Sequence, residues 1–144
     1  MANENLWSAL KVPESSITPK SILEDSAKGL AKQTKEILKG EVKTKKPSVV
    51  FADTLQKVAP MTNTNDLLIG SFWIIAPKMN NYNVEIIRIT YSILEFYPLV
   101  LEDIINDHIY EIKSEEEYRE YLKTIIQSEA VLRITQNLIN QSLS

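Results

Sequence analysis

Apolar residues recur with a helical period near both ends of the chain and with a strand period between them. From residue 19 to residue 39 they lie three or four positions apart, as on the buried side of an amphipathic helix. Thr18 is suited to cap this helix, Pro19 to its first position and Gly40 to its end. The pattern predicts a helix over 19–39 whose core-facing side consists of Leu23, Ala27, Leu30, Thr34, Ile37 and Leu38.

The middle of the chain favours a mainly antiparallel sheet. Residues 67–76 and 84–93 are rich in isoleucine and aromatic residues, and the turn-like sequence PKMNNYN separates them. The segments 95–105 and 108–112 add two more strands. Because proline has no N–H to donate to a strand ladder, Pro98 places the first of these at an edge or a bulge. We expect a meander of about four strands.

Two C-terminal helices complete the predicted fold. The first begins at Ser114, with Glu117 three residues later as in a capping box, and the second begins at Ser128. The apolar side of the first helix consists of Tyr118, Tyr121, Leu122, Ile125 and Ile126. The prediction is an α+β fold with one long N-terminal helix, an antiparallel sheet, and two C-terminal helices packed on one face.

The predicted organisation is an N-terminal arm at 1–17 followed by a single α+β domain at 18–144. Apolar positions in the segment 48–59 fit a short helix and a strand equally well. The arm fits a docked and a free segment equally well. The sequence leaves both points open.

Composition narrows the class of protein. The 144 residues are 44% apolar and 24% charged, as in ordinary globular domains, and include no cysteine. Disulfides, thiolate metal sites and cysteine nucleophiles are therefore excluded. The first residues lack the basic start and apolar run of a secretory signal, and FWIIA at 72–76 is far shorter than the roughly 20 residues of a membrane span. We expect a cytoplasmic protein without a membrane segment.

The net charge is −3, but the charged residues are distributed unevenly along the chain. Residues 1–60 hold ten lysines against seven acidic residues, a net +3, whereas residues 61–144 are net −6. Lysines on the outer side of the first helix and in the connector after it form a candidate surface for a protein partner: Lys28, Lys32, Lys35, Lys39, Lys43, Lys45 and Lys46. Interleaved arginine and aromatic residues are missing there, which argues against nucleic acid.

No catalytic signature emerges from the residue types. His108 is the one histidine, no G-x-S-x-G sequence is present, and three glycines cannot form the usual phosphate-binding loops. Asp103, Asp107 and Glu111 lie near His108, but their spacing matches no calcium loop. We predict neither a cofactor nor a metal.

The leading hypothesis is a noncatalytic protein-binding module of accessory, regulatory or immunity type. An edge strand or exposed aromatic residues are its candidate surfaces for homodimer formation. The first alternative is a small enzyme or ligand carrier with a pocket between sheet and helices. Glu85 or Glu95 would then be a buried carboxylate with a raised pKa. The second alternative is nucleic-acid binding through the lysine-lined helix.

Overall fold

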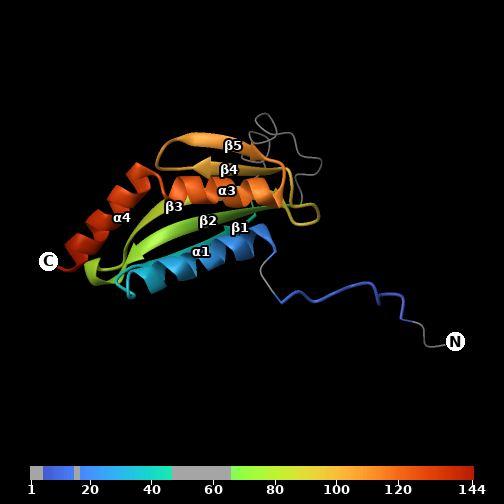
Figure 1. Cartoon of the computed structure of the whole chain (residues 1–144), viewed down its shortest axis with the longest axis horizontal. Helices are drawn as coiled ribbons and strands as arrows, with labels where there is room; N and C mark the ends of the chain where they lie inside the picture. The colour runs from blue at the N-terminus through green and yellow to red at the C-terminus, as the bar shows by residue number, and fades with distance from the viewer. Residues whose placement is uncertain (1–4, 15–16, 47–65) are drawn as a thin grey trace.

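The structure of the chain is a computed structural model that describes residues 5–14, 17–46 and 66–144. It has an α+β fold in which the described part contains three α-helices and a five-stranded sheet (Figure 1). In chain order the elements are α1 (Pro19–Gln33), β1 (Lys39–Lys45), β2 (Leu67–Ala76), the short 3-10 helix η2 (Pro77–Met79), β3 (Tyr82–Ser92), β4 (Leu99–Asp103), β5 (His108–Ile112), α3 (Glu115–Ile126) and α4 (Glu129–Ser142).

The sheet is an antiparallel meander, because its strands lie in the order in which they follow along the chain. The predicted hairpin is confirmed: β2 and β3 pair from Leu67 opposite Ser92 to Ala76 opposite Tyr82. The expected number of strands is wrong by one. The additional strand is β1, which pairs with β2 over seven residues and falls where the sequence had suggested a helix end and a connector.

The first helix is shorter than predicted. It begins as expected, with Thr18 and Ser21 exchanging cap hydrogen bonds and Pro19 in its first turn. It ends at Gln33 rather than at residue 39, because the Thr34 hydroxyl accepts a hydrogen bond from the Leu38 N–H. The chain reverses direction there through residues with positive φ, Lys35 and Glu36. The expectation of one long N-terminal helix is therefore wrong: α1 has 15 residues and follows an arm.

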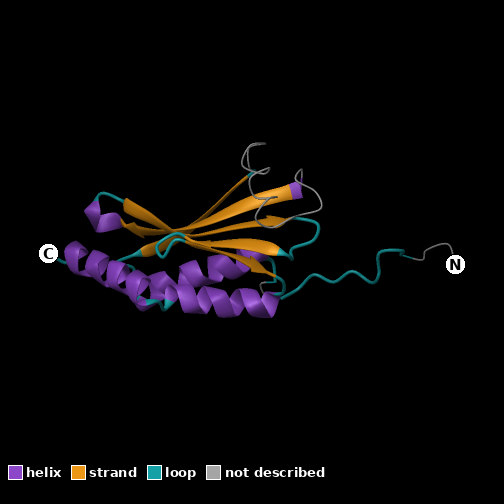
Figure 2. Ribbon diagram, turned by 90° about the horizontal axis from the view of Figure 1, so that it is seen from above, coloured by secondary structure: helices purple, strands orange, loops and turns teal. Residues whose placement is uncertain are grey.

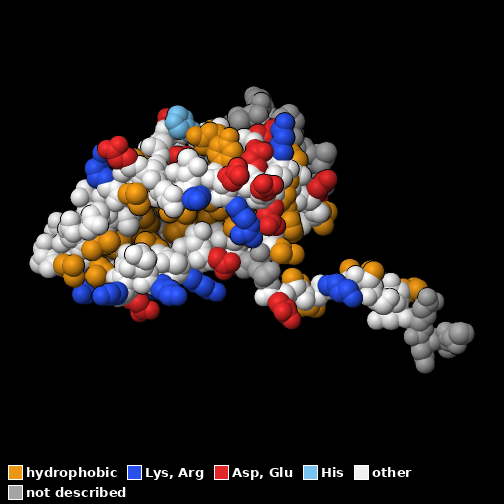
Figure 3. Space-filling view, in the orientation of Figure 1, with side chains coloured by type: hydrophobic (Ala, Val, Ile, Leu, Met, Phe, Trp, Pro, Cys, Tyr) orange, Lys and Arg blue, Asp and Glu red, His pale blue; other side chains and the backbone are white. Residues whose placement is uncertain are grey.

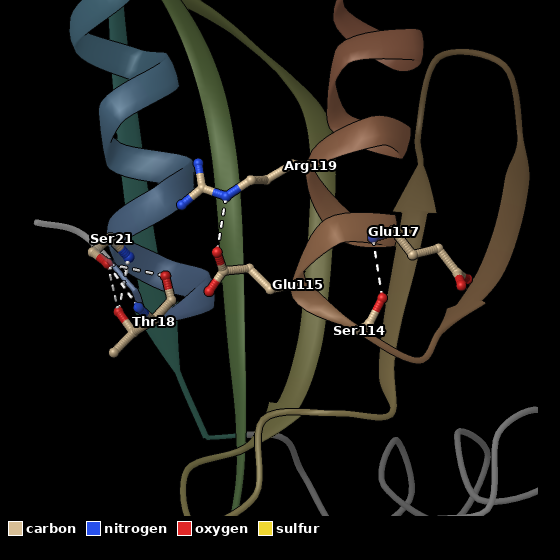
Figure 4. A network of polar contacts seen from close by, with 6 residues as sticks. All are labelled: Thr18, Ser21, Ser114, Glu115, Glu117 and Arg119. Carbon is tan, nitrogen blue, oxygen red and sulfur yellow. Dashed lines mark hydrogen bonds and ion pairs between the residues drawn. The ribbon is translucent and has the colours of Figure 1, made fainter.

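The C-terminal helices begin where the sequence predicted. Ser114 caps α3 by accepting a hydrogen bond from the Glu117 N–H, and Ser128 caps α4. Figure 4 shows the starts of α1 and α3, with Arg119 extending from α3 toward α1 and bonded to Glu115 at 3.1 Å. All three helices lie against one face of the sheet (Figure 2).

The core lies between the helix layer and the sheet. Leu23 of α1, Leu101 of β4 and Tyr118 of α3 are fully buried within it. The Tyr118 hydroxyl also donates a hydrogen bond of 2.8 Å to the Pro19 carbonyl oxygen, which ties α3 to the first residue of α1. The segment 48–59, for which the sequence left helix and strand open, lies outside the described residues.

The described part of the arm, residues 5–14, runs away from the start of α1 (Figures 1 and 2). Local hydrogen bonds shape it into a short turn, in which the Ser8 N–H donates to the Asn5 carbonyl oxygen and the Leu10 N–H to that of Trp7. Every side chain from Asn5 to Glu14 is exposed.

Candidate functional site

A large groove opens between α1 and α4 on the helix-covered face of the sheet. Its volume is about 1130 Å³, and its floor is formed by Phe72 and Ile74 of β2 and Ile86 of β3. Figure 3 shows hydrophobic side chains gathered in the hollow between the helices on this face. Apolar side chains from the two helices continue this surface up the walls: Leu30, Val131, Leu132 and Ile139. We call this hollow the α1/α4 groove.

A bulge between β2 and β3 creates part of the groove floor. Phe72 pairs with Ile87, whereas the next residue, Trp73, pairs with Glu85, so Ile86 is an extra residue in β3. Such a bulge interrupts the alternation of side chains along a strand. As a result Ile86 and Ile87 are both buried, and Ile86 lines the groove.

Gly29 is the unusual residue in the groove wall. It lies in the interior of α1, where glycine is less favourable than alanine by roughly 0.5–1 kcal/mol. A Cβ atom added there would meet no atom within 4 Å, so packing within the chain does not require the glycine. The missing side chain instead leaves the α1 backbone open to close approach by a bound group.

Polar residues surround the opening of the groove. Gln33 on α1 and Gln136 on α4 are exposed beside the apolar walls. Glu129 and Arg133 of α4 form an exposed ion pair at 4.0 Å on the same rim. An apolar floor with a polar rim is the usual anatomy of a binding surface.

The groove continues as a narrower depression between α1 and α3. This depression has a volume of about 310 Å³ and shares Ser26, Ile126 and Gln127 with the α1/α4 groove. Ile22 of α1 and Leu122 and Ile126 of α3 are its apolar side chains, and the charged Asp25, Arg119 and Lys123 also line it. The two hollows together follow α1 from its second turn to its end, which suits an elongated ligand rather than a compact one.

The predicted lysine surface is not one continuous stripe. All seven lysines are exposed, but they belong to different elements. Lys28 and Lys32 are on α1, Lys35 is in the turn, and three others are on β1; Lys46 follows that strand. Acidic residues lie among them, since Lys28 and Lys39 share a surface depression with Glu24, Glu36 and Glu41. The result is a mixed surface rather than the uniformly positive one that phosphate binding favours.

The two carboxylates proposed as catalytic candidates lie in different surroundings. Glu85 is on the face of the sheet opposite the helices and binds Arg88 through two hydrogen bonds of 3.0 and 2.6 Å. The bulge at Ile86 brings these two residues, three apart in sequence, onto one face. Glu95 is exposed in the loop after β3. Neither residue reaches the α1/α4 groove.

Among the described residues, Glu102, which sequence reasoning missed, is the carboxylate whose pKa is shifted. It lies opposite Arg88 in the sheet, with its Oε2 atom 3.9 Å from the Arg88 guanidinium. That oxygen is buried and has no hydrogen-bond partner. Burial raises the pKa of Glu102, an effect that the Arg88 charge opposes and the Glu85 charge reinforces. The signal in the sequence was an acidic residue inside an apolar strand.

The acidic residues around His108 do not form a cluster. Asp103 is buried and accepts hydrogen bonds of 3.1 and 2.9 Å from the Asn106 backbone and side chain. His108 pairs with Asp103 across the hairpin, but Asp107 and Glu111 are exposed. Within the described residues, no group of three or more acidic or histidine side chains is arranged to hold a metal ion.

Comparison with known proteins adds no functional information. No protein-family model, curated protein or solved structure matches this chain. None of the helices in residues 5–14, 17–46 and 66–144 has the length and apolar character needed to cross a bilayer.

Proposed function

We propose that this protein is a noncatalytic, cytoplasmic binding module whose α1/α4 groove receives an apolar peptide segment of a protein partner. The observation that carries the proposal is an apolar groove of about 1130 Å³ with a glycine in its wall that internal packing does not require. Helical segments commonly bind in such grooves through apolar residues three, four and seven positions apart.

The shape and lining of the groove favour a peptide over a small polar substrate. Its volume slightly exceeds the 300–1,000 Å³ range of typical small-molecule pockets, and it continues along α1 as an elongated depression. The charged side chains that line it, Glu129 and Arg133, are exposed at its rim rather than directed at an enclosed reaction centre. These features support binding without chemistry.

The second candidate is an enzyme or ligand carrier that uses a buried carboxylate. The buried carboxylate of Glu102 favours it, because burial raises its pKa, which is the direction of shift that a carboxylate general acid or base uses. Glu102 is on the opposite face of the sheet from the groove, since Arg88 and Glu102 pair there. Glu102→Gln therefore separates the two functions: groove binding should be unchanged, whereas carboxylate chemistry should be lost.

The test of the proposed function is selection of short random peptides displayed on phage against the full-length chain. We expect enriched peptides with apolar residues at helical spacing and reduced binding to Gly29→Met, whose side chain would project into the groove. Loss of about 1.4 kcal/mol or more would appear as at least a tenfold weaker affinity. Lys28→Met is the matched control, since it adds the same side chain to α1 at an exposed position outside the groove.

The outcomes separate the candidate surfaces. Peptides that bind wild type and Lys28→Met equally and Gly29→Met poorly support the groove. Acidic peptides that are lost on reversing Lys32 and Lys35 to glutamate would instead assign binding to the lysines. If no peptide is enriched, or if enriched peptides ignore both substitutions, the proposal fails.

A further inference from the structure

The N-terminal arm carries exposed apolar side chains, which are the kind of surface that the apolar α1/α4 groove can bind. Its four large apolar side chains are almost fully exposed: Leu6 is 84% exposed, Trp7 74%, Leu10 69% and Val12 95%. Leu6 and Leu10 are four residues apart around a short turn, with Trp7 between them. This spacing is the one by which helical peptides anchor in apolar grooves.

The direction of the arm favours delivery to a neighbouring molecule. Thr18, the cap of α1, has extended backbone angles of φ −83° and ψ 152°. The arm before it continues away from the helix that forms the groove wall (Figures 1 and 2).

We infer that the α1/α4 groove of one copy receives residues 5–12 of a second copy, so that two chains exchange arms. This inference rests on the proposed function and names the apolar segment that the groove binds. In a two-fold arrangement with antiparallel α1 helices, the start of each α1 lies beside the groove of its partner. Two identical contacts then close the assembly as a dimer.

The described part of the arm and the groove rim each carry one charge of each sign. The arm carries Lys11 and Glu14, three residues apart, and the groove rim carries Glu129 and Arg133. Glu129 and Arg133 pair with each other at 4.0 Å, so Lys11 and Glu14 would have to displace that ion pair to bind them. Exposed pairs of this kind add little affinity, but they favour one orientation of the bound segment.

Gly29 fits the same arrangement. Aromatic anchors bind in well-packed pockets near the centre of an interface, where they approach the opposing surface closely. The absence of a Cβ at Gly29 opens the α1 wall beside the apolar floor formed by Phe72 and Ile74. We place Trp7 of the second copy at this point.

The experiment is a complementation test by sedimentation velocity on full-length protein over a range of concentrations. Wild type and Lys28→Met should form dimers. The arm variant Trp7→Ser/Leu10→Ser and the groove variant Gly29→Met should each weaken self-association by about thirtyfold or more, as expected for hot-spot residues. Mixing these two variants should restore part of the self-association, because one of the two contacts in the mixed dimer joins an intact arm to an intact groove.

Other results overturn the inference. Dimers that persist in both single variants would place the interface elsewhere. Monomers at every concentration would exclude exchange; in a Trp73→Phe background, shielding of Trp7 from a soluble quencher would then indicate that the arm folds onto its own chain. If wild type is monomeric but phage-selected peptides still bind in a Gly29-dependent way, arm exchange fails and the proposed function stands. If neither is observed, both fail.

Discussion

Gly40 of β1 packs directly against Ala27 of α1. A Cβ atom added at Gly40 would lie 2.6 Å from the Ala27 Cα and 2.7 Å from its Cβ, distances that real Cβ atoms essentially never show. The glycine that the sequence suggested as a helix end is therefore the point where helix and strand come closest. Its role is steric, because its φ is not positive.

Gly40→Ala should destabilise the protein. The added methyl group meets helix backbone rather than a flexible side chain, so α1 and β1 must separate, at a cost of about 1–3 kcal/mol. Urea unfolding followed by circular dichroism measures this as a lower midpoint with an unchanged slope. A variant as stable as wild type would show that the contact tolerates expansion.

Gly29→Ala should have the opposite effect on stability. Its Cβ meets no atom within 4 Å, and the substitution removes a glycine from a helix interior, so the free energy of unfolding should rise by roughly 0.5–1 kcal/mol. If the groove binds as proposed, the same variant should bind selected peptides less tightly than wild type. Higher stability with weaker binding is a combination that a purely structural role for Gly29 does not produce.

Tyr118→Phe should destabilise the junction of α1 and α3. The substitution keeps the buried ring but removes the hydroxyl that donates a hydrogen bond of 2.8 Å to the Pro19 carbonyl oxygen. Leaving that acceptor without its partner should lower the free energy of unfolding by about 1–2 kcal/mol. Tyr82→Phe, at a largely exposed position, is the control and should leave the urea midpoint within experimental error.

Glu102→Gln should increase stability more at neutral than at acidic pH. Burial raises the pKa of Glu102 above its ordinary value, so the folded protein binds this proton more tightly than the unfolded chain. The ionised carboxylate therefore lowers stability as pH rises from the unfolded pKa to the folded one, and the deficit persists above it. Because glutamine cannot ionise, the variant does not undergo this fall in stability.

Urea unfolding of the two proteins at about pH 4 and pH 7 measures the effect. The stability of Glu102→Gln relative to wild type should be greater at the higher pH. Glu95→Gln, which removes an exposed loop carboxylate, controls for the change in net charge. A difference between Glu102→Gln and wild type that does not vary with pH would show that Glu102 has the same proton affinity in both states.

Elements whose residues follow one period were predictable from the sequence. In α3 the cap Ser114 and the buried Tyr118 and Leu122 lie where the pattern placed them. The end of α1 was missed because Ile37 and Leu38 continue the helical spacing of apolar residues into the turn. β1 was missed because it has few apolar residues: its outward positions are mostly lysine. The alternation of these lysines with smaller residues was the available sign of a strand.

The groove could not be predicted from periodicity alone. Its residues come from α1, β2, β3, α3 and α4, and only the fold brings these elements together. The bulge that adds Ile86 to its floor depends on strand register, which the sequence does not state. One local clue was available: Gly29 interrupts a helical pattern that has no need of a glycine.

The two outer strands of the described sheet, β1 and β5, differ in how strongly their side chains oppose pairing with another chain. Unpaired N–H and C=O groups on an outer strand can template another chain, and lysine side chains discourage this. β1 carries exposed lysines along its length, whereas β5 presents the exposed Ile109. In the described part of the chain, β1 is therefore the less favourable template for a further strand, and the lysines that resemble a binding surface in the sequence also oppose pairing at this edge.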